Sequence, residues 1–141
     1  MDITDIVAIH QILALYGHLL DDRDWDRLSM VFTDDATFDS ADAGGGPAVH
    51  SLNDLRAMFD NPRTMHPLAH HITNPYVWQD ADGTVHARSK IVGILADGHA
   101  GSGSYFDTLV RTPDGWPIRE RIVKLRRESQ LLRRPPEYRK S

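Results

Sequence analysis

The sequence contains no cysteine among its 141 residues. It therefore has no disulfide framework, no thiolate nucleophile and no cysteine metal site. We see no segment that approaches the ~18 consecutive apolar residues of a membrane-spanning helix. The N-terminal stretch MDITDIVAIH carries acids where an export signal needs a basic start, so we expect no signal peptide and a cytoplasmic location.

A strong charge of either sign is also missing. The net charge is −4 and the isoelectric point is about 6.0, which gives no reason to expect nucleic acid or a membrane as a partner. The length, with 40% hydrophobic and 26% charged residues, is typical of one globular domain. We assign residues 1–128 to this domain and residues 129–141 to a basic C-terminal tail, which is solvated or packs against a partner.

The first half of the sequence predicts mainly helices. Residues 3–20 carry an apolar stripe at helical spacing, and Thr4 or Asp5 can cap its start. The polar stretch 21–24 breaks this helix, and a second short helix is predicted over 25–32. A brief strand over 36–39 precedes a glycine loop at 43–47. A third helix is predicted over 51–60, with Ser51 as its cap.

The second half alternates with a period of two, which is typical of strands. Residues 70–79, 84–96, 102–112 and 116–126 are separated by Asp-Gly turn signals at 82–83, 97–98 and 114–115. Helices followed by consecutive antiparallel strands predict an α+β fold.

His70 is the first candidate for chemistry. Residues two apart in a strand share a face, so His70, Ile72 and Asn74 are expected to point one way. Histidine is the natural proton carrier because its ordinary pKa lies close to neutrality. The alternative is a structural histidine whose ring is satisfied by a backbone carbonyl.

Asp21 and Tyr16 lie at the end of the first predicted helix. Asp21 directly follows Leu19-Leu20, and it is either a partner for a buried group or one of several solvent-facing acids. Tyr16 belongs to the apolar stripe, so it is either a core tyrosine or one whose hydroxyl lines a cavity.

Arg119 and Arg121 share the last predicted strand, on the face opposite Trp116 and Ile118 if the strand is regular. Either both face outward, or a bulge turns one inward, where it would suit an anionic substrate or an oxyanion. The histidines at 66, 70 and 71 do not have the spacing of a metal motif, so no metal is expected. Nucleophile-elbow, P-loop and dinucleotide motifs are absent from the sequence.

Several motifs taken together resemble a known family. They are Tyr16-x4-Asp21-x-Arg23-Asp24-Trp25-Asp26, Val31-Phe32-Thr33-Asp34-Asp35-Ala36-Thr37, His70-x3-Asn74, Gly103-x-Tyr105-x-Asp107, and Asp114-Gly115-Trp116 followed by Arg121. Over residues 5–126 the chain is similar to SnoaL-like proteins of the nuclear-transport-factor-2-like superfamily. Scytalone dehydratase, bile-acid dehydratase and polyketide cyclases are among its members.

The resemblance implies a cone-shaped α+β fold in which N-terminal helices and a strongly curved, mixed or antiparallel sheet enclose a pocket. It implies a homodimer or homotrimer as well. Asp21 and His70 match the catalytic Asp–His pair of the dehydratase branch. Tyr16 and Arg121 match pocket residues, and Asn74, Trp25 and Tyr105 join them as candidate substrate-binding residues.

Two departures narrow the expected activity. The catalytic base of ketosteroid isomerases would fall at about Ser40, which argues against the isomerase chemistry of those enzymes. Leu95 lies near the place of the second pocket histidine of scytalone dehydratase, which argues against that specific activity. We therefore predict a cofactor-independent lyase that performs a dehydratase-type elimination on a small hydrophobic substrate such as a ring compound. The alternatives are a cyclase or isomerase that uses the same pair, and a non-catalytic ligand-binding or assembly module.

Overall fold

The computed structural model describes residues 1–127, in which five strands form one mixed sheet. The strand order is β1-β5-β4-β3-β2, with β1 parallel to β5 and the other neighbours antiparallel. The strands are β1 (Phe32–Asp39), β2 (Ala69–Gln79), β3 (Val85–Ile94), β4 (Ala100–Leu109) and β5 (Ile118–Leu125). The predicted α+β class is confirmed. The predicted tail and its boundary at residue 128 lie outside the described residues.

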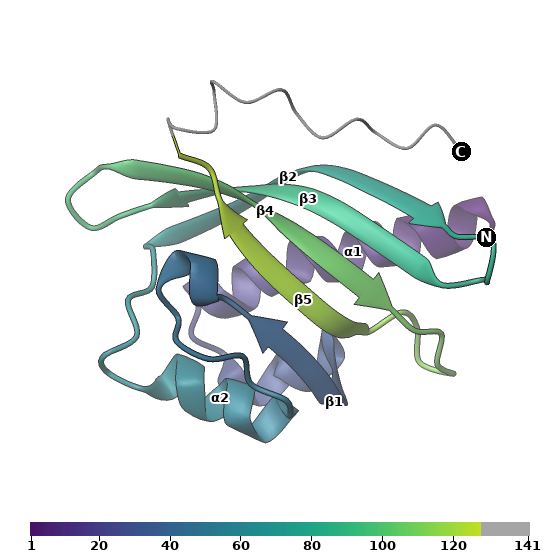
Figure 1. Ribbon diagram of the computed structural model, residues 1–141, viewed down its shortest axis with the longest axis horizontal. Coiled ribbons are helices and arrows are strands. Elements are labelled where there is room, and N and C mark those ends of the chain that lie inside the picture. Colours follow the sequence, from purple (N-terminus) through teal and green to yellow (C-terminus); the bar gives the residue numbers. More distant parts are fainter. Residues whose placement is uncertain (128–141) are drawn as a thin grey trace.

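The long helix α1 (Ile3–Asp21) crosses one face of the sheet (Figure 1). Its N-cap is Asp2, and neither Thr4 nor Asp5 takes this place. The Asp5 backbone N–H donates to the Asp2 carboxylate at 2.9 Å, and the Asp2 N–H donates to the Asp5 carboxylate at 3.3 Å. This reciprocal capping box satisfies two N–H groups that have no partner inside the helix.

Asp5 also joins the start of α1 to the segment before β5. Its buried carboxylate accepts a hydrogen bond from Trp116 Nε1 at 2.9 Å and lies 3.1 Å from Arg111 Nη2. The hydrogen bond from Trp116 is the main reason that the pKa of Asp5 lies below its ordinary value. A link between residues so far apart in sequence holds α1 across the sheet.

The composition of α1 corrects one expectation. An 18-residue window of this helix has a mean hydropathy of 1.4, so α1 is long and apolar enough to cross a membrane by length and composition alone. Core helices can have the same composition, and α1 buries Ile9, Leu13 and Tyr16 against the sheet.

The segment after α1 differs from the prediction. Residues Trp25–Met30 form the short 3-10 helix η1, and β1 already begins at Phe32, where a helix was expected. β1 pairs with β5, which lies about eighty residues later, so local sequence cannot reveal this partner. A second 3-10 turn, η2 (Ala41–Ala43), follows. The helix predicted over 51–60 is confirmed as α2 (Leu52–Asp60), with Ser51 as its N-cap.

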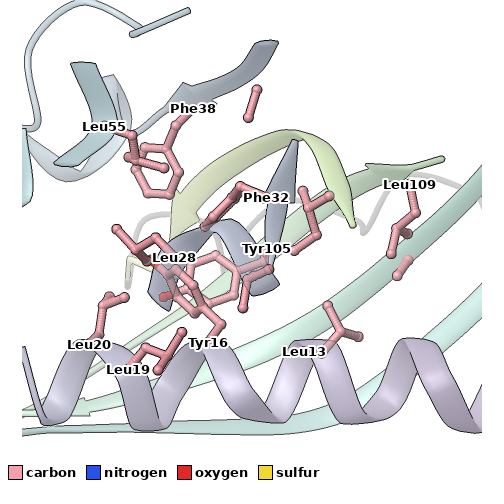
Figure 2. Close-up of a cluster of buried hydrophobic side chains, with 14 of the residues drawn as sticks. Leu13, Tyr16, Leu19, Leu20, Leu28, Phe32, Phe38, Leu55, Tyr105 and Leu109 are labelled. Carbon is pink, nitrogen blue, oxygen red and sulfur yellow. The ribbon is translucent and has the colours of Figure 1, made fainter. Parts of the chain in front are cut away.

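The core fills the space between α1, η1, β1 and the inner face of the sheet. In Figure 2, Leu13, Tyr16, Leu19 and Leu20 rise from α1 toward Leu28, Phe32 and Tyr105. All seven side chains are buried. Burying side chains of this size contributes about 1.5–3 kcal/mol each, so the packing of α1 on the sheet is a main source of stability.

Candidate active site

Asp21 and His70 form a closely bonded pair. His70 Nδ1 lies 2.7 Å from Asp21 Oδ1, and the His70 backbone N–H donates to both carboxylate oxygens, at 2.9 and 3.1 Å. A carboxylate accepts hydrogen bonds, so Nδ1 carries the proton and donates it to Asp21. Because one residue supplies both the backbone and the ring donor, the orientation of the imidazole is fixed and Nε2 keeps a free lone pair.

The close approach of α1 to β2 brings the two residues together. Asp21 is the last residue of α1, and His70 is the second residue of β2. Gly17 lies one helical turn before Asp21, so both are on the same side of α1. A Cβ at Gly17 would lie 2.9 Å from the His70 carbonyl oxygen. Only glycine therefore lets the helix lie this close to the strand.

His70 is placed to be a base near neutral pH. Its side chain is only 5% exposed, whereas that of Asp21 is 29% exposed. Burial lowers the pKa of His70 below its ordinary value of 6.5, and the hydrogen bond and charge of Asp21 oppose this fall without cancelling it. At neutral pH the ring is neutral, and its basic nitrogen, Nε2, is not the one that bonds to Asp21.

A bulge in the sheet turns Arg121 inward. The pairing of β4 with β5 shifts between Thr108–Glu120 and Leu109–Ile118, which breaks the alternation along β5. Ile118 and Arg121 are consequently both buried, although a regular strand would place them on opposite faces. Arg119 remains exposed, and its Nη2 lies 3.4 Å from Asp35 Oδ2. The bulge alternative of the sequence analysis is therefore the one that the structure adopts.

Arg121 is sealed inside the protein against Asp107. Arg121 Nε and Nη2 donate to the two Asp107 oxygens at 2.7 and 2.8 Å, and both side chains are 0% exposed. The guanidinium also lies over the rings of Tyr16 and Tyr105, with 4.1 and 4.2 Å to the centroids. Its third nitrogen, Nη1, is buried without a hydrogen-bond partner.

The groups around Arg121 keep one protonation state at ordinary pH. Burial alone would lower the pKa of Arg121, but the charge and hydrogen bonds of Asp107 raise it above its ordinary value. Burial also raises the pKa of Tyr16 to about 12, although Arg121 opposes that rise. Burial likewise raises the pKa of Tyr105 well above its ordinary value, so both hydroxyls stay protonated. The rings of Tyr16 and Tyr105 pack edge to face, with their centroids 5.5 Å apart.

Asn74 does not share a regular strand face with His70. The register between β2 and β3 shifts after Thr73, and Asn74 is exposed with a positive φ of 51°. Asparagine is one of the few non-glycine residues that adopt this conformation readily. The expected alternation is thus correct for His70 and Ile72 and wrong at Asn74, because a bulge interrupts the strand.

Trp25 lies half-buried beside the loop that leads into β2. Its ring packs 5.5 Å from Phe59 and 5.3 Å from His66, whose Nε2 donates to the Phe59 carbonyl at 2.8 Å. His66 belongs to the same loop, and its charge is among the influences that lower the pKa of His70. Within residues 1–127, no group of three or more His, Asp or Glu side chains converges so that it could hold a metal ion.

Two residues of functional interest were not singled out from the sequence. Asp107 occurs in the quoted motifs, yet only cross-strand pairing shows that it neutralises Arg121. Gly17 interrupts the apolar stripe of α1 four residues before Asp21, and that break in a helix was an available signal.

Comparison with known proteins gives matches over most of the chain. The family described as SnoaL-like domain matches residues 1–122. An uncharacterized protein of Mycobacterium tuberculosis is 31% identical over 130 residues, which span 86% of this chain and 85% of the relative. The shared sequence therefore extends over nearly the whole domain.

Solved structures share the fold. A candidate aromatic ring hydroxylase of Novosphingobium aromaticivorans is 29% identical, with a TM-score of 0.73 and coverage of 89% of this chain and 91% of that one. A candidate scytalone dehydratase of the same organism has 19% identity, a TM-score of 0.72 and coverage of 88% and 85%. An NTF2-like protein with a cystatin-like fold, also from this organism, has 24% identity, a TM-score of 0.73 and coverage of 93% and 90%. This chain belongs to the SnoaL-like domain family, as its sequence motifs predicted.

Proposed function

We propose that this chain is a cofactor-independent acid–base enzyme that eliminates water, or a similar leaving group, from a small hydrophobic substrate such as a ring compound. The Asp21–His70 pair carries the proposal, because its 2.7 Å hydrogen bond leaves Nε2 of a neutral, 5% exposed imidazole as a base. The similarity to a candidate scytalone dehydratase and the family membership are consistent with it.

In the proposed reaction, His70 Nε2 removes a proton from the carbon next to a carbonyl group. The electrons of that C–H bond form the enolate, and then the carbon–carbon double bond as the C–O bond to the leaving hydroxyl breaks. The imidazolium returns its proton to the departing oxygen, which leaves as water. Asp21 acts as a positioning residue that fixes the tautomer of His70 and stabilises the imidazolium while it exists.

The enolate oxygen needs a hydrogen-bond donor. Arg121 Nη1 is a cationic N–H group without a partner in the described structure, and donors of this kind stabilise developing negative charge. Tyr16 and Tyr105 would present their hydroxyls to the same substrate, and Trp25 would add an apolar wall. Arg121 is 0% exposed, so this part of the proposal requires the core near Tyr16 to open on binding.

The test measures elimination from a panel of cyclic β-hydroxy ketones, whose enone products absorb ultraviolet light. We expect His70→Ala to reduce kcat/KM by about 10²–10⁴-fold, the usual contribution of a positioned general base. Asp21→Asn should also nearly abolish turnover, because the amide no longer fixes the tautomer in which Nε2 is the base. Circular dichroism establishes whether each variant keeps its fold, and the matched control is His71→Ala, since His71 is exposed on the same strand.

Full activity of folded His70→Ala on any ketone that the wild type converts contradicts the mechanism. Deuterium exchange at the carbon next to the carbonyl separates the alternatives. Exchange without elimination, dependent on His70, favours an isomerase or cyclase that uses the same pair. Ligand binding without exchange favours a non-catalytic binding module, an alternative that the tight packing around Tyr16 and Arg121 supports.

A further inference from the structure

Two buried polar atoms on the inner face of the sheet have no hydrogen-bond partner among residues 1–127. One is Arg121 Nη1, which the proposed mechanism uses, and the other is Ser89 Oγ, which it does not use. Ser89 lies on β3 between the buried residues Ala87 and Ile91, and it is 0% exposed. A buried hydroxyl without a partner destabilises a folded chain, and native proteins rarely keep one. Packing of the core therefore does not explain a serine at this position.

The strand register places Ser89 beside the Arg121 cluster. Ser89 pairs across the sheet with Tyr105, and the Tyr105 ring centroid lies 4.2 Å from the guanidinium carbon of Arg121. Ala87, Asp107 and Arg121 form the next row of the inner face. Diagonal neighbours on one face of a sheet are about 7–8 Å apart, so Ser89 and Arg121 can contact one small group of a ligand.

The bulge in β2 leaves the other flank of Ser89 open. The pairing of β2 with β3 is interrupted opposite Ser89, because the register shifts between Thr73 and Tyr76. Ser89 therefore has a register partner on β4 and none on β2. A serine hydroxyl rotates freely and both donates and accepts hydrogen bonds, so this one can turn toward a bound molecule.

The charges near this position favour an uncharged ligand. Asp107 already matches the charge of Arg121 through two hydrogen bonds, and both side chains are 0% exposed. The carboxylate of Asp21 adds a further negative charge on the same side of the sheet. A bound carboxylate would add an uncompensated negative charge, which is costly to bury. A carbonyl oxygen adds none, and the imidazolium of His70 balances the enolate that forms from it.

We propose that Ser89 Oγ and Arg121 Nη1 together bind one uncharged oxygen, the carbonyl oxygen of a cyclic ketone, and that the site rejects the corresponding carboxylate. A carbonyl oxygen has two lone pairs, so it accepts one hydrogen bond from each donor. Ser89 is then a catalytic residue, the second donor to the oxygen that becomes the enolate. Both side chains are 0% exposed, so the oxygen reaches them when the core near Tyr16 opens. This inference rests on the proposed function, because it concerns the same site.

The first test measures the binding of 2-tetralone, a cyclic ketone without a leaving group, by NMR titration. Tetralin lacks the oxygen, and tetralin-2-carboxylate replaces it with a charge. We expect the wild type to bind the ketone more tightly than the carboxylate by about tenfold or more. Ser89→Ala should weaken ketone binding by about 5–10-fold and leave tetralin binding unchanged. The matched control is Ser104→Ala, because Ser104 lies on the opposite face of the neighbouring strand.

Urea denaturation distinguishes a ligand-binding hydroxyl from a structural one. Ser89→Ala should keep or raise the urea midpoint, because it removes a buried hydroxyl that has no partner. A structural hydroxyl would give the reverse result, a lower midpoint with unchanged ketone affinity. That result overturns the proposal, as do equal affinities of the wild type for ketone and carboxylate, or no ketone binding at all.

His70→Ala separates this inference from the proposed function. This variant should bind 2-tetralone as the wild type does, because His70 acts on the C–H bond and not on the oxygen. Ketone binding that depends on Ser89, in a wild type that eliminates nothing, supports this inference and contradicts the proposed function. Elimination that depends on His70, with full activity in Ser89→Ala, supports the proposed function and overturns the role of Ser89.

Discussion

Two acid–base pairs lie on the inner side of the sheet, and burial affects them in different ways. Asp107 and Arg121 are both 0% exposed and share two hydrogen bonds in parallel. Asp21 and His70 are 29% and 5% exposed and share one bond between side chains. The sealed pair joins neighbouring strands, whereas the other pair joins the end of a helix to the start of a strand.

The difference lies in whether a proton can move. A guanidinium keeps its charge at any ordinary pH, so the sealed pair is a fixed dipole inside the core. An imidazole can exist in either state, and burial favours the neutral one for His70. Burial thus gives the first pair charges that do not change with pH, and it makes His70 a base that Asp21 can support when the imidazole becomes charged.

The largest expected effect comes from breaking the sealed pair. Asp107→Ala should lower the free energy of unfolding by about 3–5 kcal/mol, because it leaves the Arg121 charge buried and unpaired. The double variant Asp107→Leu/Arg121→Met should recover most of that loss, since it removes both charges. Urea denaturation measures both. A cost below about 1 kcal/mol for the single variant would mean that the pair contributes no more than an exposed one.

A smaller effect is expected where α1 meets His70. Gly17→Ala would place a Cβ 2.9 Å from the His70 carbonyl oxygen, and overpacking of this kind costs about 1–3 kcal/mol. The shift should also lengthen the Asp21–His70 hydrogen bond, seen as an upfield move of the Nδ1 proton in the NMR spectrum. The control is Gly101→Ala, whose Cβ would meet nothing within 4 Å. An unchanged Nδ1 proton in Gly17→Ala would show that the pair does not depend on this close contact.

The smallest effect concerns pH. Burial lowers the pKa of His70 below its ordinary value of 6.5 in the folded state. At a pH between the lowered pKa and 6.5, the unfolded chain therefore binds more protons than the folded protein. The free energy of unfolding should therefore fall as pH drops through this window, and His70→Gln should lack that part of the fall. Because Asp21 raises the pKa of His70, Asp21→Asn should lower it further. NMR titration of the imidazole checks this, and a rise in that variant would contradict the assigned role of Asp21.

Much of the fold could be predicted from local pattern. The stripe of α1, the Ser51 cap and the Asp-Gly turns each depend on residues close together in the chain, and all three were predicted correctly in kind. β1 was predicted too short and η1 too long, because a parallel partner about eighty residues away decides where that strand begins. Periodicity within a segment carries no information about such a partner.

The candidate site, like the fold, could be predicted only in part from the sequence. Strand alternation placed His70 and Ile72 on one face, and the family motifs selected Asp21 as the partner of His70. Alternation failed at Asn74 and could not decide the facing of Arg121, because each lies at or beyond a bulge that adds one residue to its strand. A single extra residue moves every later side chain of the strand to the opposite face of the sheet.

The sequence by itself determined the class of fold, the absence of thiol chemistry, the family, and the two residues that make up the candidate pair. Only the tertiary structure decided that Asp21 reaches both the backbone and the ring of His70, that Gly17 permits this approach, and that Asp107 neutralises Arg121. Each of these depends on distances between segments that are remote in the chain. Such distances are set by packing α1 on the sheet and by the register of its strands, and local sequence preferences encode neither.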